Sequence, residues 1–210
     1  MRVTAIERLP RKRRYDVRID GVRVVPLSRD VLAAAGLHIG QDVDESRLAE
    51  LEAAEARHTA MTSALRLLSY RPRSEREMRD ALRARRIPEA IAGETLDRLR
   101  ELQLLDDEAF AEAWTESRQR NSPRGRRLLL TELAQKGVER EVARQSVAAI
   151  DEEAAAVRAG RKRSRTLRNL KFGDFRRRLG DFLARRGFGY DACETAIKQL
   201  WAETGDADGD

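Results

Sequence analysis

Apolar and polar residues alternate over the first part of the chain, where Val and Ile are frequent. The alternation runs through residues 3–9 and 15–27, and Asp20-Gly21 interrupts the second run. A two-residue period is typical of a β-strand, and an Asp-Gly pair suits a type I′ turn, because both central residues need positive φ. We therefore predict a small antiparallel sheet with a hairpin, in which the last strand ends at Pro26 because proline cannot donate to a ladder.

After this region the apolar positions recur at intervals of three and four residues, which indicates amphipathic helices. Ser28 is a predicted N-cap for a short helix over residues 29–35, and Gly36 is expected to close it. A longer helical pattern extends from Asp44 to Tyr70. We therefore expect helix in most of the chain beyond the N-terminal sheet.

From residue 61 onward the apolar pattern recurs three times, with offsets of 51 and 50 residues and no internal gap. Windows aligned on Leu82, Leu133 and Leu183 share five further apolar columns, which predicts a genuine internal repeat rather than a shared helical period. The further columns hold Met78, Leu129 and Leu179; Ile87, Val138 and Phe188; Ile91, Val142 and Ala192; Leu96, Val147 and Ile197; and Leu99, Ile150 and Leu200.

Each window is typical of a helix, a tight break and a second helix, and one more helix precedes it. Ser74 and Glu77 form a predicted capping box at the start of the first window, and Ser122-Pro123 predicts the corresponding start of the second. Glycine ends the first helix at 137 and 187, whereas Arg86 takes that place in the first window. We expect Arg86 to cost stability there.

These patterns predict a mainly α protein: three tandem three-helix repeats that form an elongated curved array, with a small N-terminal extension that contains a β-hairpin. Such thin units are stabilised by stacking on one another. The expected divisions are 1–43 for the extension with its short helix, 44–105 for the long helix and first repeat, 106–151 for the second repeat, 152–201 for the third, and 202–210 for an acidic disordered tail.

The composition excludes several classes of protein. A single cysteine, Cys193, rules out a disulfide framework and a cysteine-based zinc cluster, and there are only two histidines. The longest apolar stretches fall far short of the ~18 residues that a membrane-spanning helix needs. We therefore expect a soluble, cytoplasmic protein that has no contact with a membrane.

The charge is uneven along the chain. The net charge is +6, yet residues 151–200 alone hold thirteen basic and seven acidic residues. Arginines recur at equivalent turns of the repeats, so stacking is expected to align them into a stripe that follows a phosphate backbone; the alternative is that each side chain extends into water. The candidate binding residues are Arg71, Arg73 and Arg76; Arg124, Arg126 and Arg127; and Arg161, Lys162, Arg163, Arg165, Arg168, Lys171, Arg176, Arg177 and Arg178.

No motif of a known catalytic site is present in the sequence. There is no phosphate-binding glycine loop, no GxSxG, no HExxH and no CxxC. A dense acidic cluster, Asp106-Asp107-Glu108, suits a metal-dependent nuclease, but it fits better as an N-cap with an acidic first turn. We therefore expect no enzyme activity, no metal and no cofactor.

Two further features allow two interpretations each. Trp114 and Trp201 suit either base stacking or the edge of a helical core, and we favour the core. The basic run Arg11–Arg14 lies between predicted strands, where a solvated loop is favoured over a phosphate contact.

Three stretches of this sequence resemble the RecX family of bacterial regulatory proteins. They are Ala64–Met78 (ALRLLSYRPRSEREM) followed by Leu82; Leu99–Gln103 leading into Leu104–Ala111 (LLDDEAFA); and Gly125 with Leu133–Val138 (LAQKGV). The resemblance is close over residues 60–150 and looser over 150–200, and the N-terminal hairpin is similar to an extension found in some members.

The resemblance implies a modulator of RecA, the recombinase that coats single-stranded DNA. RecX proteins lie in the groove of the RecA filament on single-stranded DNA and limit filament growth, and so restrain ATP hydrolysis, recombination and co-protease activity, although some members promote recombination. The implied partners are RecA, its filament and DNA itself, with a monomeric chain. The family has no catalytic residues to transfer.

Two other functions stay open at this stage. One is a general DNA- or RNA-binding helical repeat protein with no recombinase partner. The other is a metal-dependent nuclease that uses Asp106 and Asp107.

Overall fold

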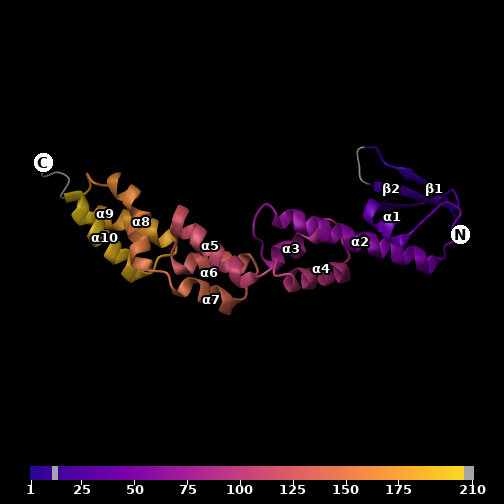
Figure 1. Ribbon diagram of the computed structural model, residues 1–210. Coiled ribbons are helices and arrows are strands. Elements are labelled where there is room, and N and C mark those ends of the chain that lie inside the picture. The colour runs from indigo at the N-terminus through magenta and orange to yellow at the C-terminus, as the bar shows by residue number, and fades with distance from the viewer. Residues whose placement is uncertain (11–13, 206–210) are drawn as a thin grey trace. The chain divides into compact units, whose positions relative to one another are not determined.

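The computed structural model describes residues 1–10 and 14–205 (Figure 1). Arg11–Arg13 of the predicted basic loop and Asp206–Asp210 of the predicted tail lie outside the described residues. The chain forms two compact units. The first comprises Met1–Pro72 and Met78–Leu105, and the second comprises Arg73–Glu77 and the chain from Asp106 onward.

The first unit begins with the predicted antiparallel sheet. Its strands are β1 (Val3–Arg8), β2 (Arg14–Ile19) and β3 (Arg23–Ser28), with β2 in the centre. Asp20 and Gly21 both have positive φ, 50° and 72°, which confirms the predicted turn. The alternating apolar side chains of the strands form the bottom of a core that the helices complete.

Pro26 does not end the last strand, contrary to the prediction. It lies inside β3 opposite Asp16, and the strand continues to Ser28. Within the described part of the chain β3 pairs only with β2, so it is an edge strand, and an edge strand tolerates a proline whose nitrogen faces away from its neighbour.

Two helices cover the sheet. α1 (Arg29–Ala35) has the predicted caps: Ser28 Oγ accepts from the Val31 N–H at 3.3 Å, and Gly36 is left-handed. α2 (Glu45–Leu68) starts after Asp44, whose carboxylate accepts from the Arg47 N–H at 2.7 Å. The buried apolar residues between sheet and helices are Val3, Val17, Ile19, Val25, Leu27, Val31, Val43, Leu48 and Leu51.

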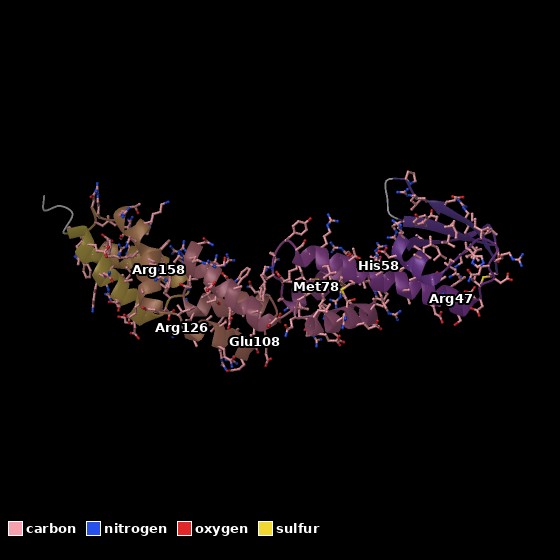
Figure 2. All side chains as sticks on the ribbon, in the orientation of Figure 1. Arg47, His58, Met78, Glu108, Arg126 and Arg158 are labelled. Carbon is pink, nitrogen blue, oxygen red and sulfur yellow. The ribbon has the colours of Figure 1, made fainter. Side chains whose placement is uncertain are left out.

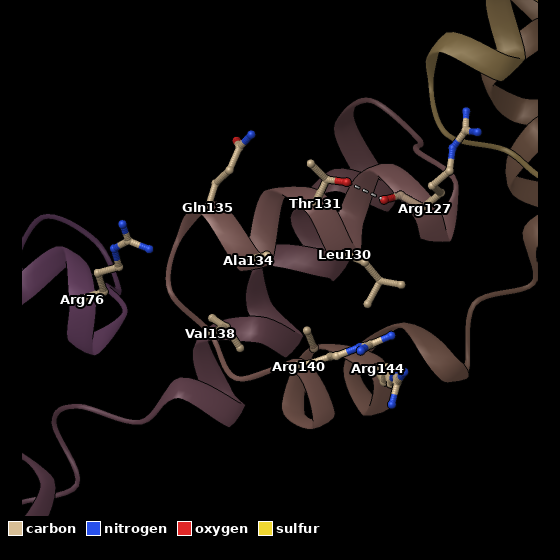
Figure 3. A pocket seen from close by; sticks show the side chains of 10 residues that line it. Arg76, Arg127, Leu130, Thr131, Ala134, Gln135, Val138, Arg140 and Arg144 are labelled. Carbon is tan, nitrogen blue, oxygen red and sulfur yellow. Dashed lines mark hydrogen bonds between the residues drawn. The ribbon is translucent and has the colours of Figure 1, made fainter.

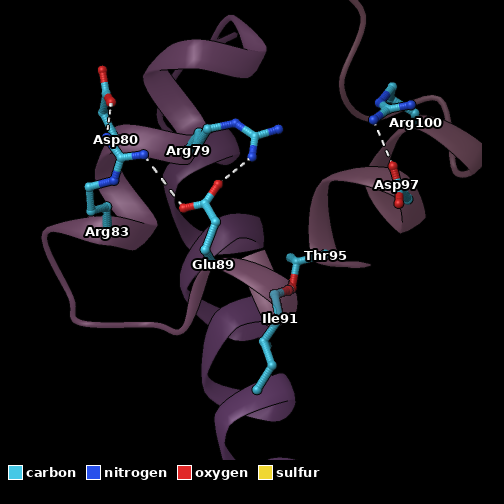
Figure 4. Close-up of polar contacts among 8 residues, drawn as sticks. All are labelled: Arg79, Asp80, Arg83, Glu89, Ile91, Thr95, Asp97 and Arg100. Atoms are coloured by element: carbon cyan, nitrogen blue, oxygen red, sulfur yellow. Dashed lines mark hydrogen bonds and ion pairs between the residues drawn. The ribbon is translucent and has the colours of Figure 1, made fainter. Parts of the chain in front are cut away.

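The second half of α2 packs against α3 (Glu75–Arg83) and α4 (Glu89–Glu101) around Met78, Leu82 and Leu96. On the outside of this bundle Glu89 accepts from Arg79 at 2.6 Å and pairs with Arg83 at 3.5 Å (Figure 4). These arginines keep the pKa of the Glu89 carboxyl below its ordinary value.

The second unit contains two three-helix bundles. α5 (Asp107–Asn121), α6 (Arg126–Gln135) and α7 (Arg140–Ala148) enclose Phe110, Leu129, Leu133 and Val147. α8 (Glu152–Arg165), α9 (Phe172–Arg185) and α10 (Tyr190–Gly205) enclose Phe175, Leu179, Leu183 and Leu200. The mainly α class with a small N-terminal sheet is confirmed.

The repeat register is visible in burial and in backbone conformation. Leu82, Leu133 and Leu183 are all fully buried. Four residues later Arg86, Gly137 and Gly187 have φ of 60°, 82° and 83°, so one left-handed residue ends the first helix of every window. Arg86 adopts this conformation with a side chain attached, as the sequence predicted.

Two predicted boundaries are wrong. Ser122-Pro123 does not start the helix of the second window, because Ser122 still ends α5 and its hydroxyl accepts from Arg186 Nη1 at 3.0 Å. The helix starts three residues later, at Arg126. At the C-terminus α10 includes residues 202–205 of the predicted tail, because Glu203 pairs with Arg161 at 2.9 Å across the bundle.

Candidate functional site

The start of α6 is fixed to the third repeat by two main-chain donors. The Gly125 N–H donates to the carbonyl oxygen of Arg186 at 2.9 Å. The Arg126 N–H donates to Glu152 Oε1 at 3.0 Å. Both acceptors belong to the next repeat along the chain, so the second and third repeats are stacked, as predicted.

The segment that precedes α3 repeats this arrangement inside the same compact unit. Ser74 Oγ donates to the carbonyl oxygen of Lys136 at 2.6 Å, and the Glu75 N–H donates to Asp107 Oδ1 at 2.8 Å. Ser74 and Glu75 lie 51 positions before Gly125 and Arg126, and Lys136 lies 50 positions before Arg186. Asp107 is the only one of the four residues that does not lie 50 or 51 positions before its counterpart. The contact is therefore a property of the repeat.

Arg126 and Arg127, two of the predicted binding residues, hold the ends of neighbouring helices. Arg126 Nη2 donates to the carbonyl oxygens of Ile150 at 2.6 Å and Ala148 at 3.3 Å, at the end of α7. Arg127 Nη2 donates to the carbonyl oxygen of Ala184 at 2.9 Å, in the last turn of α9. The last carbonyls of a helix lack intrahelical partners and attract cations, so both arginines have a structural task (Figure 2 labels Arg126).

Arg124 also has a partner inside the protein. It is ion-paired with the buried carboxylate of Glu132, which accepts in addition from Trp114 Nε1 at 2.9 Å and Arg118 Nε at 3.0 Å. Burial lowers the pKa of the Arg124 guanidinium from its ordinary value. Glu132 was not singled out in the sequence, although a lone acid within the apolar run of α6 was a usable signal.

The other arginines of the predicted stripe vary in their surroundings. Arg161 pairs with Glu203, Arg176 with Glu194 at 2.9 Å and Arg177 with Asp174 at 3.0 Å. All of these side chains except the half-buried Glu194 are exposed, and exposed pairs contribute little to stability and open at little cost. The remaining partnered cations are Arg71, whose Nη1 donates to the Pro72 carbonyl at 2.9 Å; Arg73, which is half-buried; and Arg163, which lies 3.5 Å from Thr166 Oγ1.

Five predicted residues are exposed cations with no partner among the residues that the structure describes. All lie on α8, on α9 or in the turn between them, and we call them the α8–α9 basic cluster. The members are Lys162, Arg165, Arg168, Lys171 and Arg178. Arg158, which Figure 2 labels, lies four and seven residues before Lys162 and Arg165, a spacing that places all three on one face of α8.

Arg76 lies at the end of a groove between α6 and α7. The groove has a cavity volume of about 960 Å³, and Leu130, Ala134 and Val138 are among its lining residues. Arg140 and Arg144, which sequence reasoning missed, line its α7 side (Figure 3). We call this space the α6–α7 groove.

The structure supports the favoured interpretation of the tryptophans. The Trp114 ring lies under Arg118, with 4.2 Å between the guanidinium carbon and the ring centroid, and Trp201 packs edge-on against Phe172 and Phe175. Both close the edge of a core.

The acidic cluster has the surroundings that were favoured. Asp106 Oδ1 accepts from the N–H groups of Glu108 and Ala109, as an N-cap does, and Cys193 is buried. Over the described residues no cluster of three potential metal ligands was found, and no helix there is long and apolar enough to span a membrane.

Comparison with known proteins identifies relatives of the whole repeat region. Models of the first, second and third three-helix domains of RecX match residues 60–99, 106–147 and 151–197. The protein named Regulatory protein RecX from Mycolicibacterium vanbaalenii is 43% identical over 133 residues, which are 59% of this chain and 72% of the relative. The protein of the same name from Bacillus velezensis is 27% identical over 196 residues, 92% of this chain and 74% of the relative.

Solved structures show the same likeness in three dimensions. A crystal structure of regulatory protein RecX has a TM-score of 0.69 and 25% identity, and the match covers 94% of this chain and 98% of that one. For RecX from Lactobacillus salivarius the TM-score is 0.63 at 25% identity, over 70% of this chain and 97% of the other.

Proposed function

Because this chain belongs to the RecX family, we propose that it is a regulatory protein that binds RecA and the RecA filament on single-stranded DNA. In this proposal it limits filament growth, and with it ATP hydrolysis, recombination and co-protease activity. It acts in the cytoplasm as a monomer, and it does so by binding, without a catalytic group of its own. The observation that carries the proposal is the match of all three repeats to RecX domains.

The α8–α9 basic cluster supports a contact with the nucleic acid of the filament. Its five cations are exposed and have no counter-charge among the described residues, so they are free to meet phosphate. Contacts of this kind release counterions, and the affinity therefore falls steeply as salt rises. In contrast, Arg124, Arg126 and Arg127 are engaged within the protein, and we assign them to the scaffold.

The same cluster also favours the second candidate, a general nucleic-acid-binding repeat protein. That function predicts strong, salt-dependent binding to bare single-stranded DNA and no effect on RecA. The two candidates are separated by a measurement in which RecA is present.

The test is RecA-catalysed ATP hydrolysis on single-stranded DNA, titrated with substoichiometric amounts of this protein. We expect hydrolysis to decline, because one bound molecule stops the growth of a whole filament. A chain that binds DNA but leaves hydrolysis unchanged would favour the second candidate.

A variant tests the role of the basic cluster. Changing Lys162, Arg165 and Lys171 together to Glu is expected to weaken binding to the filament and to reduce its dependence on salt. The control changes Arg83, Arg98 and Arg100 to Glu, three exposed arginines of the first unit; Arg83 pairs with Asp80 and Glu89, Arg98 with Glu101 and Arg100 with Asp97. Equal losses in both variants would show that net charge, rather than the cluster, is responsible.

A further inference from the structure

The α6–α7 groove combines an apolar floor with a basic rim. Leu130, Ala134 and Val138 line the floor. The rim consists of Arg76, Arg127, Arg140 and Arg144. The stem of Arg76 packs on Gly137, and Arg140 has no partner among the residues that the structure describes. Among the described residues no acidic side chain lines this groove, although Arg144 pairs at 3.5 Å with Glu141, which is not one of its lining residues. Arg140 therefore holds an unpaired positive charge beside an apolar surface.

Two of the groove arginines lie at helix N-termini. Arg127 lies in the first turn of α6, which contains no acid, although its guanidinium also holds the end of α9, and Arg140 opens α7. A cation at a helix N-terminus opposes the helix dipole and costs roughly 0.3–1 kcal/mol. By comparison α5 and α8 begin with two acidic residues each, as the dipole favours.

The third repeat contains the same groove without the same charge. It lies between α9 and α10, with a cavity volume of about 470 Å³, and residues 50 positions after those of the α6–α7 groove line it. There Tyr190 and Glu194 replace Arg140 and Arg144, and Glu194 is paired with Arg176. The basic rim is therefore not a consequence of the repeat fold.

We propose that the α6–α7 groove binds an acidic segment with apolar side chains on the protein subunits of the filament. Charge complementarity calls for an acidic occupant, and the apolar floor favours a polypeptide over a polynucleotide, since a phosphate backbone gains nothing from Leu130 and Val138. The inference rests on the proposed function, because that function supplies the filament.

The experiment compares binding of fluorescently labelled chain to RecA–single-stranded DNA filaments with binding to the same DNA alone. The groove variant is Arg140→Glu with Arg144→Gln. Its matched control is Arg29→Glu with Arg66→Gln, which makes the same charge change at the first residue of α1 and in the last turn of α2, both exposed. We expect the groove variant alone to lose about tenfold in affinity for the filament, while affinity for bare DNA stays the same.

A second variant separates a peptide from DNA in the groove. Ala134→Gln replaces an apolar side chain of the exposed floor by a neutral polar one, so it weakens an apolar contact and leaves a phosphate contact unchanged. The control Ala184→Gln makes the same change in the α9–α10 groove, where we expect no effect. Thermal unfolding of every variant checks that the fold is intact, and Arg140→Glu is expected to leave it unchanged or to raise its midpoint because it agrees with the α7 dipole.

The possible outcomes distinguish a failure of the proposed function from a failure of the groove or of its peptide occupant. Wild-type protein that does not bind the filament overturns the proposed function, and this inference with it. Wild-type protein that binds while the groove variant binds equally well overturns the groove alone. Loss of filament and bare-DNA binding together, or filament binding that Arg140→Glu with Arg144→Gln weakens but Ala134→Gln leaves unchanged, shows that the groove takes nucleic acid and overturns the peptide occupant.

Discussion

Gly125 lies so close to Gly187 that a Cβ atom on Gly125 would overlap the Gly187 carbonyl group. The backbone of Gly125 is extended, with φ −72° and ψ 160°, so the glycine is not required by its own conformation. It is required by the neighbouring repeat, whose tight turn reaches the start of α6. Ser74 is the counterpart of Gly125 and reaches the next repeat through its hydroxyl instead.

We predict that Gly125→Ala destabilises the second unit by about 2 kcal/mol, because overpacking a contact that cannot relax costs about 1–3 kcal/mol. Urea unfolding measures it. The control is Gly93→Ala in α4, where a Cβ meets open space and the expected change is a gain of about 1 kcal/mol. A Gly125→Ala protein as stable as wild type would mean that the two repeats do not touch here in solution.

Arg86→Gly is expected to stabilise the first unit. Arg86 has φ of 60°, and the left-handed conformation costs a residue with a side chain about 1 kcal/mol that glycine does not incur. The matched change in the opposite direction is Gly137→Ala, where φ is 82° and a Cβ would overlap Arg76. The midpoint temperature of thermal unfolding should rise for Arg86→Gly and fall for Gly137→Ala. A shift in the same direction for both variants would contradict the explanation.

Glu132→Gln should lower the free energy of unfolding by about 2 kcal/mol. Breaking a fully buried ion pair costs about 3–5 kcal/mol, and the loss is smaller here because Arg118 and Arg124 retain some contact with water. The change leaves an acceptor for Trp114 but removes the charge that both guanidinium groups need. Urea unfolding followed by tryptophan fluorescence measures it, since both tryptophans lie in the second unit. Glu116→Gln, in an exposed pair with Arg120, is the control and is expected to have no effect.

Cys193 is expected to react slowly with thiol reagents at neutral pH. Burial raises the pKa of its thiol, and the nearby carboxylate of Glu152 raises it further, so little thiolate is present. The reaction with a disulfide reagent should become fast in urea, at the concentration that unfolds the second unit. Fast reaction of the native protein would show that α10 opens locally.

Asp107 should make the stability of the second unit depend on pH. Burial raises the pKa of its carboxyl above the ordinary 3.8, although the hydrogen bond from the Glu75 amide opposes the change. The folded state therefore holds the proton to a higher pH than the unfolded state, and this contribution to stability is lost as pH rises through the interval above 3.8.

Asp107→Asn keeps an acceptor for the Glu75 amide and removes the titration. The difference in unfolding free energy between variant and wild type should thus grow in favour of the variant as the pH is raised from 3 to 6. A difference that stays constant over this range would contradict the raised pKa.

Local patterns predicted most of the fold. The helix caps at Ser28 and Gly36, the turn at Asp20-Gly21 and the left-handed residue at Arg86 depend on the backbone within a few residues, and the sequence contains that information. The repeat register followed from the spacing of Leu82, Leu133 and Leu183.

The errors involve partners far away in the sequence. The start of α6 depends on Arg186, 61 residues after Gly125, and Pro26 is tolerated because β3 has one neighbour only. For the candidate site, positive charge alone did not separate Arg126 and Arg127, which hold helix ends, from Lys162 and Arg165, which have no partner among the described residues. Arg140 was missed because its groove exists only when two helices pack.

The hydrogen bonds that fix α6 to the third repeat use main-chain amides as donors, with a carbonyl and one carboxylate as acceptors. Main-chain groups are the same in every residue except proline, so the two donors require no particular side chain beyond the missing Cβ at Gly125. A chain built in this way can gain or lose a whole fifty-residue module by duplication or deletion and still offer a compatible docking end to the next one.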